Sequence, residues 1–183
     1  DDLYFDEMLY GSALRSKYPR ALVKNIDTSK AKALDGVYAV LTAKDIPGDR
    51  FIGHLVQDWP AMIDIGEETR YLGDAVALVA ARDKKILKEA LNLIEVDYEE
   101  LSPVINPEMG MKDDAPKVHE SGNILSRQYL KRGDADEAIK NSKYVVTEKY
   151  STPPTEHAFL EPECAVANYE DGILTVYTGG QGV

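Results

Sequence analysis

Cysteine and histidine are scarce in this 183-residue sequence, which holds one cysteine and three histidines. With Cys164 alone, no disulfide can form within the chain, which fits a reducing cytoplasm. His54, His119 and His157 stand far apart, and none has a partner at the spacing of a zinc site. The sequence therefore predicts neither a disulfide framework nor a metal ion held by protein side chains.

Basic residues are few and long apolar runs are missing. The chain carries 21 Lys and Arg against 32 Asp and Glu, a formal net charge of −11. Because so acidic a surface repels phosphate backbones and anionic lipids, we expect no nucleic-acid and no membrane partner. No apolar stretch approaches the ~18 residues of a membrane span, and the acidic N-terminus does not match a signal peptide. An apolar fraction of 44% indicates a globular protein, which we expect in the cytoplasm.

A complete catalytic or phosphate-binding motif is also missing. Cys164 lies in an apolar strand pattern with no histidine arranged to activate it, so inert, buried packing is the favoured interpretation. The glycine-rich stretch 179–182 follows a strand pattern but lacks the GxGxxG spacing and a following helix. His157, Glu161 and Glu163 lie close together, yet the proline between the two glutamates favours a structural turn. The residues alone therefore predict no complete active site.

Strand and helix patterns alternate over residues 1–105. Strands are expected at 8–15, 21–27, 37–42, 75–81 and 95–101, with a short helix after Asp27 and a longer one after Asp83. The longer helix carries one apolar stripe, formed by Ile86, Leu87, Ala90, Leu91 and Ile94. Residues 75–101 thus form a β-α-β pattern, and residues 49–69 a long loop with aromatic anchors. This mixture predicts a self-contained α/β domain over residues 1–105.

Residues 106–183 follow a different pattern. Prolines, glycines and polar residues interrupt 106–132, which predicts an extended linker. Beyond it we expect a short helix at 135–141, capped by Asp134, and strands at 144–150, 164–169 and 173–177. Glu170-Asp171-Gly172 is a hairpin turn signal between the last two strands.

Many of these stretches resemble, in order and spacing, the molybdenum-containing large subunits of the xanthine dehydrogenase and aldehyde oxidase family. The matching stretches are Asp2 to Ser16, Pro19 to Ala21, Asn25 to Asp27, Leu34 to Val37, Tyr71 to Ala81, Val96 to Val104, Asp114 to His119, Gly122-Asn123, Gly133-Asp134 and Glu156 to Pro162. The resemblance implies an α/β (α+β) fold, with an α/β hammerhead domain at 1–105. A linker and the first strands of a truncated molybdopterin-binding domain would follow at 106–183. Residues 58–60 and 66–71 most resemble the selenium-dependent xanthine dehydrogenases.

The resemblance also implies a chemistry. Family members hydroxylate a carbon of a purine, an N-heterocycle or an aldehyde, with oxygen derived from water. A molybdenum–molybdopterin cofactor does this chemistry, and electrons leave through iron–sulfur clusters and FAD on other domains or subunits of an oligomeric enzyme. The family's glutamine that hydrogen-bonds toward the molybdenum oxo ligand matches Gln181, although Gly180 replaces the usual Thr or Ser before it. Gly180 and Gln181 are therefore the implied cofactor-binding residues, with no catalytic residue and no metal ligand in this chain.

Two hypotheses of function follow. In the first, the chain is the non-catalytic N-terminal portion of a molybdenum hydroxylase. In the second, it is a stand-alone hammerhead module that acts as an interaction or assembly domain without redox activity. We further expect the strands after residue 143 to be less stable than the first domain, since their packing partners are absent and their edges exposed.

Overall fold

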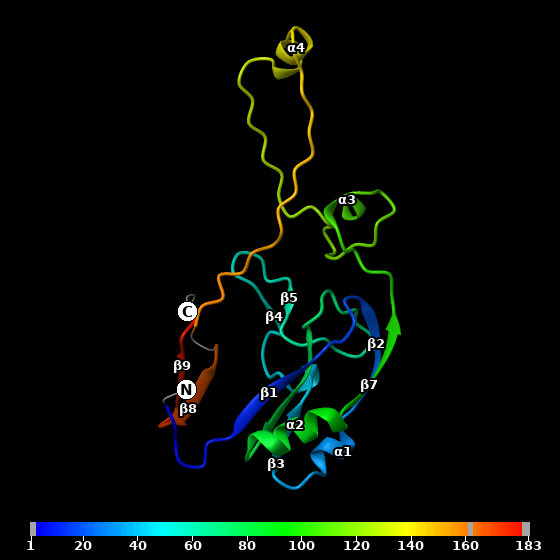
Figure 1. The fold of residues 1–183 in the computed structure, drawn as a ribbon. Coiled ribbons are helices and arrows are strands. Elements are labelled where there is room, and N and C mark those ends of the chain that lie inside the picture. The colour runs from blue at the N-terminus through cyan, green and yellow to red at the C-terminus, as the bar shows by residue number, and fades with distance from the viewer. Residues whose placement is uncertain (1–2, 161–162, 181–183) are drawn as a thin grey trace. The chain divides into compact units, whose positions relative to one another are not determined.

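The computed structural model describes residues 3–160 and 163–180, and the chain divides into two compact units (Figure 1). The first unit spans residues 6–125, and the second comprises 126–183 with the first five residues. Residues 106–125 thus group with the first unit. The division into functional domains at 1–105 and 106–183 stays a prediction.

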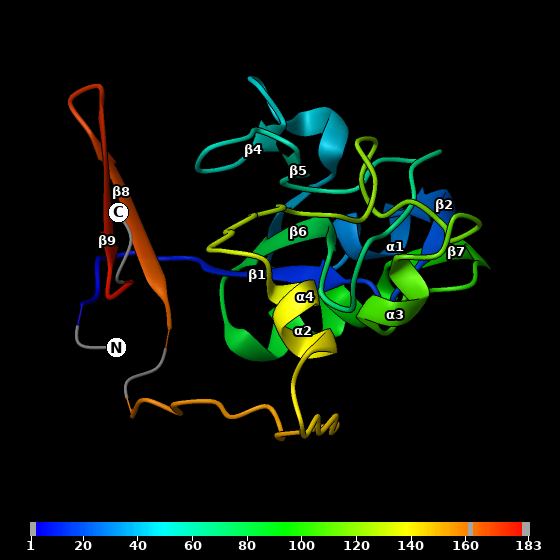
Figure 2. The same ribbon diagram turned by 90° about the horizontal axis from the view of Figure 1, so that it is seen from above.

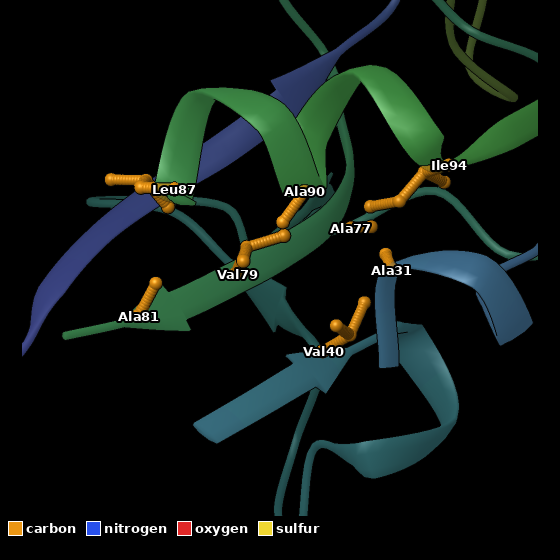
Figure 3. Close-up of a cluster of buried hydrophobic side chains, with 8 residues drawn as sticks. All are labelled: Ala31, Val40, Ala77, Val79, Ala81, Leu87, Ala90 and Ile94. Atoms are coloured by element: carbon orange, nitrogen blue, oxygen red, sulfur yellow. The ribbon is translucent and has the colours of Figure 1, made fainter. Parts of the chain in front are cut away.

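A three-stranded antiparallel sheet forms the centre of the first unit. Strand β6 (Ala75–Ala81) lies between β1 (Tyr10–Arg15) and β3 (Val37–Leu41). Helices α1 (Ser29–Lys32) and α2 (Lys84–Leu93) pack against one face of this sheet, and Figure 2 shows α2 beside β1. Figure 3 shows the resulting core, which consists of Ala31, Val40, Ala77, Val79, Ala81, Leu87, Ala90 and Ile94. The apolar stripe of α2 and the alternation of β6 both point into this core, which confirms the predicted mixture of helices and strands.

Helix α2 starts at its predicted cap. Asp83 Oδ1 accepts hydrogen bonds from the backbone N–H groups of Lys85 and Ile86, at 2.9 and 2.8 Å. These bonds satisfy two of the four amides that have no partner within the helix.

Replacing Asp83 with alanine should therefore lower the free energy of unfolding by about 1 kcal/mol. Asp83→Asn keeps a side-chain acceptor at the same position and should cost less than about 0.5 kcal/mol. Urea unfolding followed by circular dichroism measures both variants. Equal losses for the two substitutions would contradict a capping role.

A second antiparallel pair, β2 (Ala21–Asp27) with β7 (Glu95–Glu100), packs beside the central sheet. Val23 of β2, Ile63 and Val76 of β6 form a second buried cluster. The predicted order of strand, helix and strand over 75–101 is present. However, β6 and β7 belong to different sheets, and every ladder among the described residues is antiparallel.

Two segments predicted as irregular contain short elements. The loop at 49–69 holds a small hairpin of β4 (Phe51–Ile52) and β5 (Trp59–Pro60), and the 3-10 turn η1 (Ala43–Asp45) precedes it. The expected linker contains α3 (Pro107–Gly110), whose first turn is capped by the side chain of Asn106, 2.7 Å from the amide of Met109.

The second unit has little regular structure. Helix α4 (Ala135–Lys140) is capped by Asp134 as predicted, 3.1 Å from the amide of Glu137. Strands β8 (Ala165–Glu170) and β9 (Ile173–Thr178) form a hairpin. Its turn residues Asp171 and Gly172 have φ values of 50° and 80°, the positive pair that a tight two-residue turn requires.

The prediction of a strand at 144–150 was wrong. Tyr144 and Val146 are 78% and 81% exposed, and the described backbone there pairs with no neighbour. An alternating pattern marks a face that can be buried, but a strand forms only where another strand completes its hydrogen bonds.

Among the described residues, every helix falls short of the length and apolarity needed to cross a membrane.

Candidate cofactor-facing site

Gly180, one of the two residues implied as cofactor-binding, lies at the open end of the β8–β9 hairpin. Ala165 pairs with Thr178 as the last rung of this ladder, and the glycines follow directly. The Gly180 N–H donates a hydrogen bond to Thr178 Oγ, at 3.2 Å. A Cβ atom added to Gly179 would meet no described atom within 4 Å. The described residues therefore leave the backbone directly after β9 open.

Glu163, Cys164, Ala165, Thr178 and Gly180 line a shallow hollow of about 350 Å³ at this end of the hairpin. Cys164 is exposed, so the expectation of buried packing was wrong. The reason is its position, because β8 begins one residue later and leaves Cys164 at the open end of the ladder. Gln181 lies outside the described residues, and its role at this hollow stays a prediction.

The hairpin exposes much of its apolar surface. All six residues of β9 are exposed, and Tyr169, Ile173 and Leu174 are 72%, 66% and 63% accessible. One aromatic contact, between the rings of Phe5 and Tyr177 at 6.0 Å, links it to the start of the chain. A lone two-stranded hairpin is marginally stable in water, and a large exposed apolar surface marks a place where another surface binds.

Amide hydrogens of β8 and β9 should consequently exchange far faster than those of β6. The hairpin opens at a cost near zero, whereas β6 opens only when the first unit unfolds. Hydrogen exchange of the 183-residue chain, read by mass spectrometry or NMR, measures both. Equally slow exchange in both elements would contradict this expectation.

The other residues singled out in the sequence are scattered. His157 is exposed, and its backbone N–H donates to Glu156 Oε1 at 2.9 Å. Glu161 lies outside the described residues, and His54 is exposed. Within the described part of the chain, no three His, Cys, Asp or Glu residues gather to hold a metal ion.

His119 was not assigned a role from the sequence, yet it joins two distant segments. Its Nδ1 lies 3.2 Å from Asp58 Oδ2, although the pair lacks hydrogen-bond geometry. Sequence spacing offers no signal for this pairing, since the two residues stand on different loops.

Two family models match this chain, one after the other. Residues 1–102 match the model described as "Aldehyde oxidase and xanthine dehydrogenase, a/b hammerhead domain". Residues 118–183 match the model described as "Molybdopterin cofactor-binding domain".

Individual relatives agree with these models. A probable xanthine dehydrogenase subunit of Bacillus subtilis is 42% identical over 98% of this chain, which covers 24% of that protein. The nicotinate dehydrogenase large molybdopterin subunit of Eubacterium barkeri is 39% identical over 98% of this chain and 42% of its own length. The chain thus spans less than half the length of these curated relatives.

Solved structures give the same result. The quinoline 2-oxidoreductase of Pseudomonas putida matches 98% of this chain and 24% of its own, with a TM-score of 0.88 and 30% identity. The aldehyde oxidoreductase of Desulfovibrio gigas matches 96% of this chain and 20% of its own, with a TM-score of 0.86 and 26% identity. The resemblance noted in the sequence is therefore confirmed, and the chain belongs to the aldehyde oxidase and xanthine dehydrogenase family.

Proposed function

We propose that this chain is the N-terminal portion of the large subunit of a cytoplasmic molybdenum hydroxylase. The observation that carries the proposal is the succession of two family matches on one chain, a hammerhead match at 1–102 and a molybdopterin-domain match at 118–183. On this basis residues 1–105 are the hammerhead domain, and residues 106–183 are the linker and the start of the molybdopterin-binding domain.

The reaction we propose for the whole enzyme converts R–H and water into R–OH, two protons and two electrons. When bound, the molybdenum–molybdopterin cofactor supplies the oxygen transfer and accepts the two electrons. Iron–sulfur and FAD domains or subunits take them onward, within an oligomeric enzyme. The substrate class is a purine, an N-heterocycle or an aldehyde. Relatives named for xanthine and nicotinate, matched over nearly the whole chain, favour a nitrogen heterocycle.

The role of this chain's own residues is to approach and orient the cofactor. At the end of β9 the backbone of Gly179 and Gly180 is uncovered and carries no side chain, which suits close approach of a bulky group. Gln181, next along the chain, would donate its amide N–H toward the molybdenum oxo group. None of these residues is a base or a nucleophile, so the chain by itself should show no turnover.

Gln181→Ala in the full-length holoenzyme should lower turnover by up to about tenfold, since one hydrogen bond contributes about 0.5–1.5 kcal/mol. Molybdenum content per polypeptide, measured in parallel, should stay unchanged. Gln181→Glu retains an acceptor but no amide donor and should not restore the rate. Full turnover of the Gln181→Ala enzyme would contradict the proposed role of Gln181.

The second candidate is a stand-alone module for interaction or assembly. The exposed apolar residues of β8 and β9 support this second candidate, because an exposed apolar surface suits a protein partner. The reading frame that encodes this chain distinguishes the two candidates. A frame that continues beyond Val183 into further molybdopterin-binding sequence, beside genes for iron–sulfur and FAD proteins, supports the hydroxylase. A stop codon directly after Val183 would support the module.

A further inference from the structure

We propose that the first unit carries a second binding site, for a small aromatic carboxylate, formed without residues of the β8–β9 hairpin. The site is a pocket of about 600 Å³ between the body of this unit and the segment 103–120. Its floor and its two rims are each held by hydrogen bonds, so the pocket is formed before any ligand enters.

The floor is the segment 66–69, which pairs with β2. Val23 N–H donates to the Glu67 carbonyl at 2.9 Å, and Thr69 N–H to the Ala21 carbonyl at 2.8 Å. The Ala21 N–H in turn donates to Thr69 Oγ1, at 2.9 Å, and Thr69 is only 1% exposed. These bonds attach the segment to the edge of β2.

The first rim is the turn at 70–74. The buried carboxylate of Asp74 accepts the backbone N–H groups of Arg70 and Tyr71, at 2.6 and 3.3 Å. Gly73 has a φ of +126°, and a Cβ there would lie 2.8 Å from the Tyr71 ring. The Tyr71 ring also packs against Trp59 in a T-shaped arrangement, with ring centroids 5.4 Å apart. Arg70 and Tyr71 are therefore fixed at the pocket mouth.

The opposite rim belongs to the segment 116–120 and depends on Asn123. Its Nδ2 donates to the carbonyls of Gly110 and Pro116, at 3.0 and 2.9 Å. Its Oδ1 accepts the Val118 N–H at 2.7 Å. This one side chain fixes the rim that carries Lys117.

Most of the charges around the pocket neutralise one another. Arg20 binds Glu68 at 2.7 Å and the Ser102 carbonyl at 3.1 Å. Glu67 is held by both Nη atoms of Arg50, at 2.7 and 2.6 Å. These groups stabilise the walls of the pocket. Their charges are already paired within the protein, so they contribute little to binding a ligand.

Two cations and one acid remain for a ligand. The guanidinium of Arg70 has one recorded bond, from Nη1 to the Asp58 carbonyl at 2.7 Å. For Lys117 and Glu120, no side-chain hydrogen bond or ion pair is recorded with any described residue. The Lys, Arg and Glu residues of the lining balance in charge, so what favours an anion is that Arg70 and Lys117 form no ion pair with a carboxylate of the described residues.

The remaining walls select the body of the ligand. Phe51, Pro60, Tyr71, Leu72, Val104 and Val118 give the pocket apolar and aromatic surfaces. The lining also includes His119, whose buried Nδ1 lies 3.2 Å from Asp58 Oδ2 without hydrogen-bond geometry. A buried nitrogen whose hydrogen bond is not formed can bond to a ligand or a water in the pocket. A flat apolar body with one carboxylate therefore fits this pocket.

The test is an NMR titration of the full 183-residue chain with benzoate, and with benzamide as its neutral counterpart. Benzoate should give saturable shifts of amides at 67–72 and 117–120, with a Kd on the order of 1 mM. Benzamide should bind about fivefold more weakly, since it lacks the charge that meets Arg70 and Lys117.

Two matched variants keep the test specific. Lys117→Gln should weaken benzoate binding about threefold, whereas Lys88→Gln, an equal change of charge on the exposed side of α2, should leave it unchanged. An absence of saturable shifts, equal binding of benzamide, or equal effects of the two variants would overturn the proposal. No molybdenum takes part in this experiment, so its outcome is independent of the proposed hydroxylase function.

Discussion

Replacing Ile63 with alanine is expected to lower the free energy of unfolding of the first unit by about 2–5 kcal/mol. Ile63 is 1% exposed and packs with Val23 of β2 and Val76 of β6, both fully buried. Its backbone N–H also donates to the Ala75 carbonyl, at 2.8 Å. The side chain thus joins the two sheets, and its truncation leaves a cavity that neither sheet can fill without moving.

Two further substitutions make this prediction specific. Ile63→Val, which removes one methylene, should cost about 0.5–1.5 kcal/mol. Ile65→Ala, on a side chain that is 39% exposed, should cost about 0.5 kcal/mol or less. Urea unfolding followed by far-UV circular dichroism gives all three values. If Ile63→Ala and Ile65→Ala cost the same, the second cluster does not join the sheets as described.

The second large effect is expected for Arg50→Leu, at about 2–3 kcal/mol near pH 7. Arg50 forms a two-pronged ion pair with Glu67 and also donates to the Met62 carbonyl at 2.9 Å. The side chains are only 20% and 34% exposed, so water replaces the lost partner poorly. Arg50→Leu leaves the Glu67 carboxylate half-buried without its cation.

This loss should depend on pH in a defined direction. The hydrogen bond from Arg50 is the main reason why the pKa of Glu67 lies below its ordinary value of 4.5. A carboxyl group with a lowered pKa in the folded state stabilises the fold above its unfolded pKa. That contribution is lost as the pH falls through the folded pKa. The difference between the wild type and Arg50→Leu should therefore shrink steadily below about pH 4.5.

Urea unfolding at neutral pH and near pH 3 tests both parts of this expectation. The control is Lys24→Gln, which breaks an ion pair with Glu99 whose side chains are 49% and 56% exposed. It should cost much less than Arg50→Leu, because water screens an exposed ion pair. A cost for Arg50→Leu that stays constant from neutral to acid pH would rule out Glu67 as its source.

Elements with strong local signals could be predicted from the sequence. Strands β2 and β6 have their predicted bounds, because their apolar patterns need no knowledge of a partner. The cap at Asp83 and the turn at Asp171-Gly172 follow from the chemistry of single residues.

Features that depend on distant partners could not be predicted in this way. The central position of β6 in its sheet depends on β1 and β3, which both lie far before it in the sequence. The alternation at 144–150 predicted a strand, but no strand among the described residues pairs with it. The pocket brings together Arg20, Arg70 and Lys117, three residues that share no local motif.

The candidate cofactor-facing site shows the same division. Local patterns located β9 and its glycine-rich end, whereas the roles of Gly180 and Gln181 came only from the family resemblance. No local rule links a glutamine after two glycines to molybdenum.

The most direct test of the central claim is the cofactor content of the protein produced from its complete reading frame in a host supplied with molybdate. Elemental analysis should find about one molybdenum per polypeptide, and fluorescence of the oxidised pterin about one molybdopterin. The 183-residue chain prepared alongside should contain neither. A complete polypeptide that is folded yet lacks both molybdenum and pterin would contradict the assignment as a molybdenum hydroxylase.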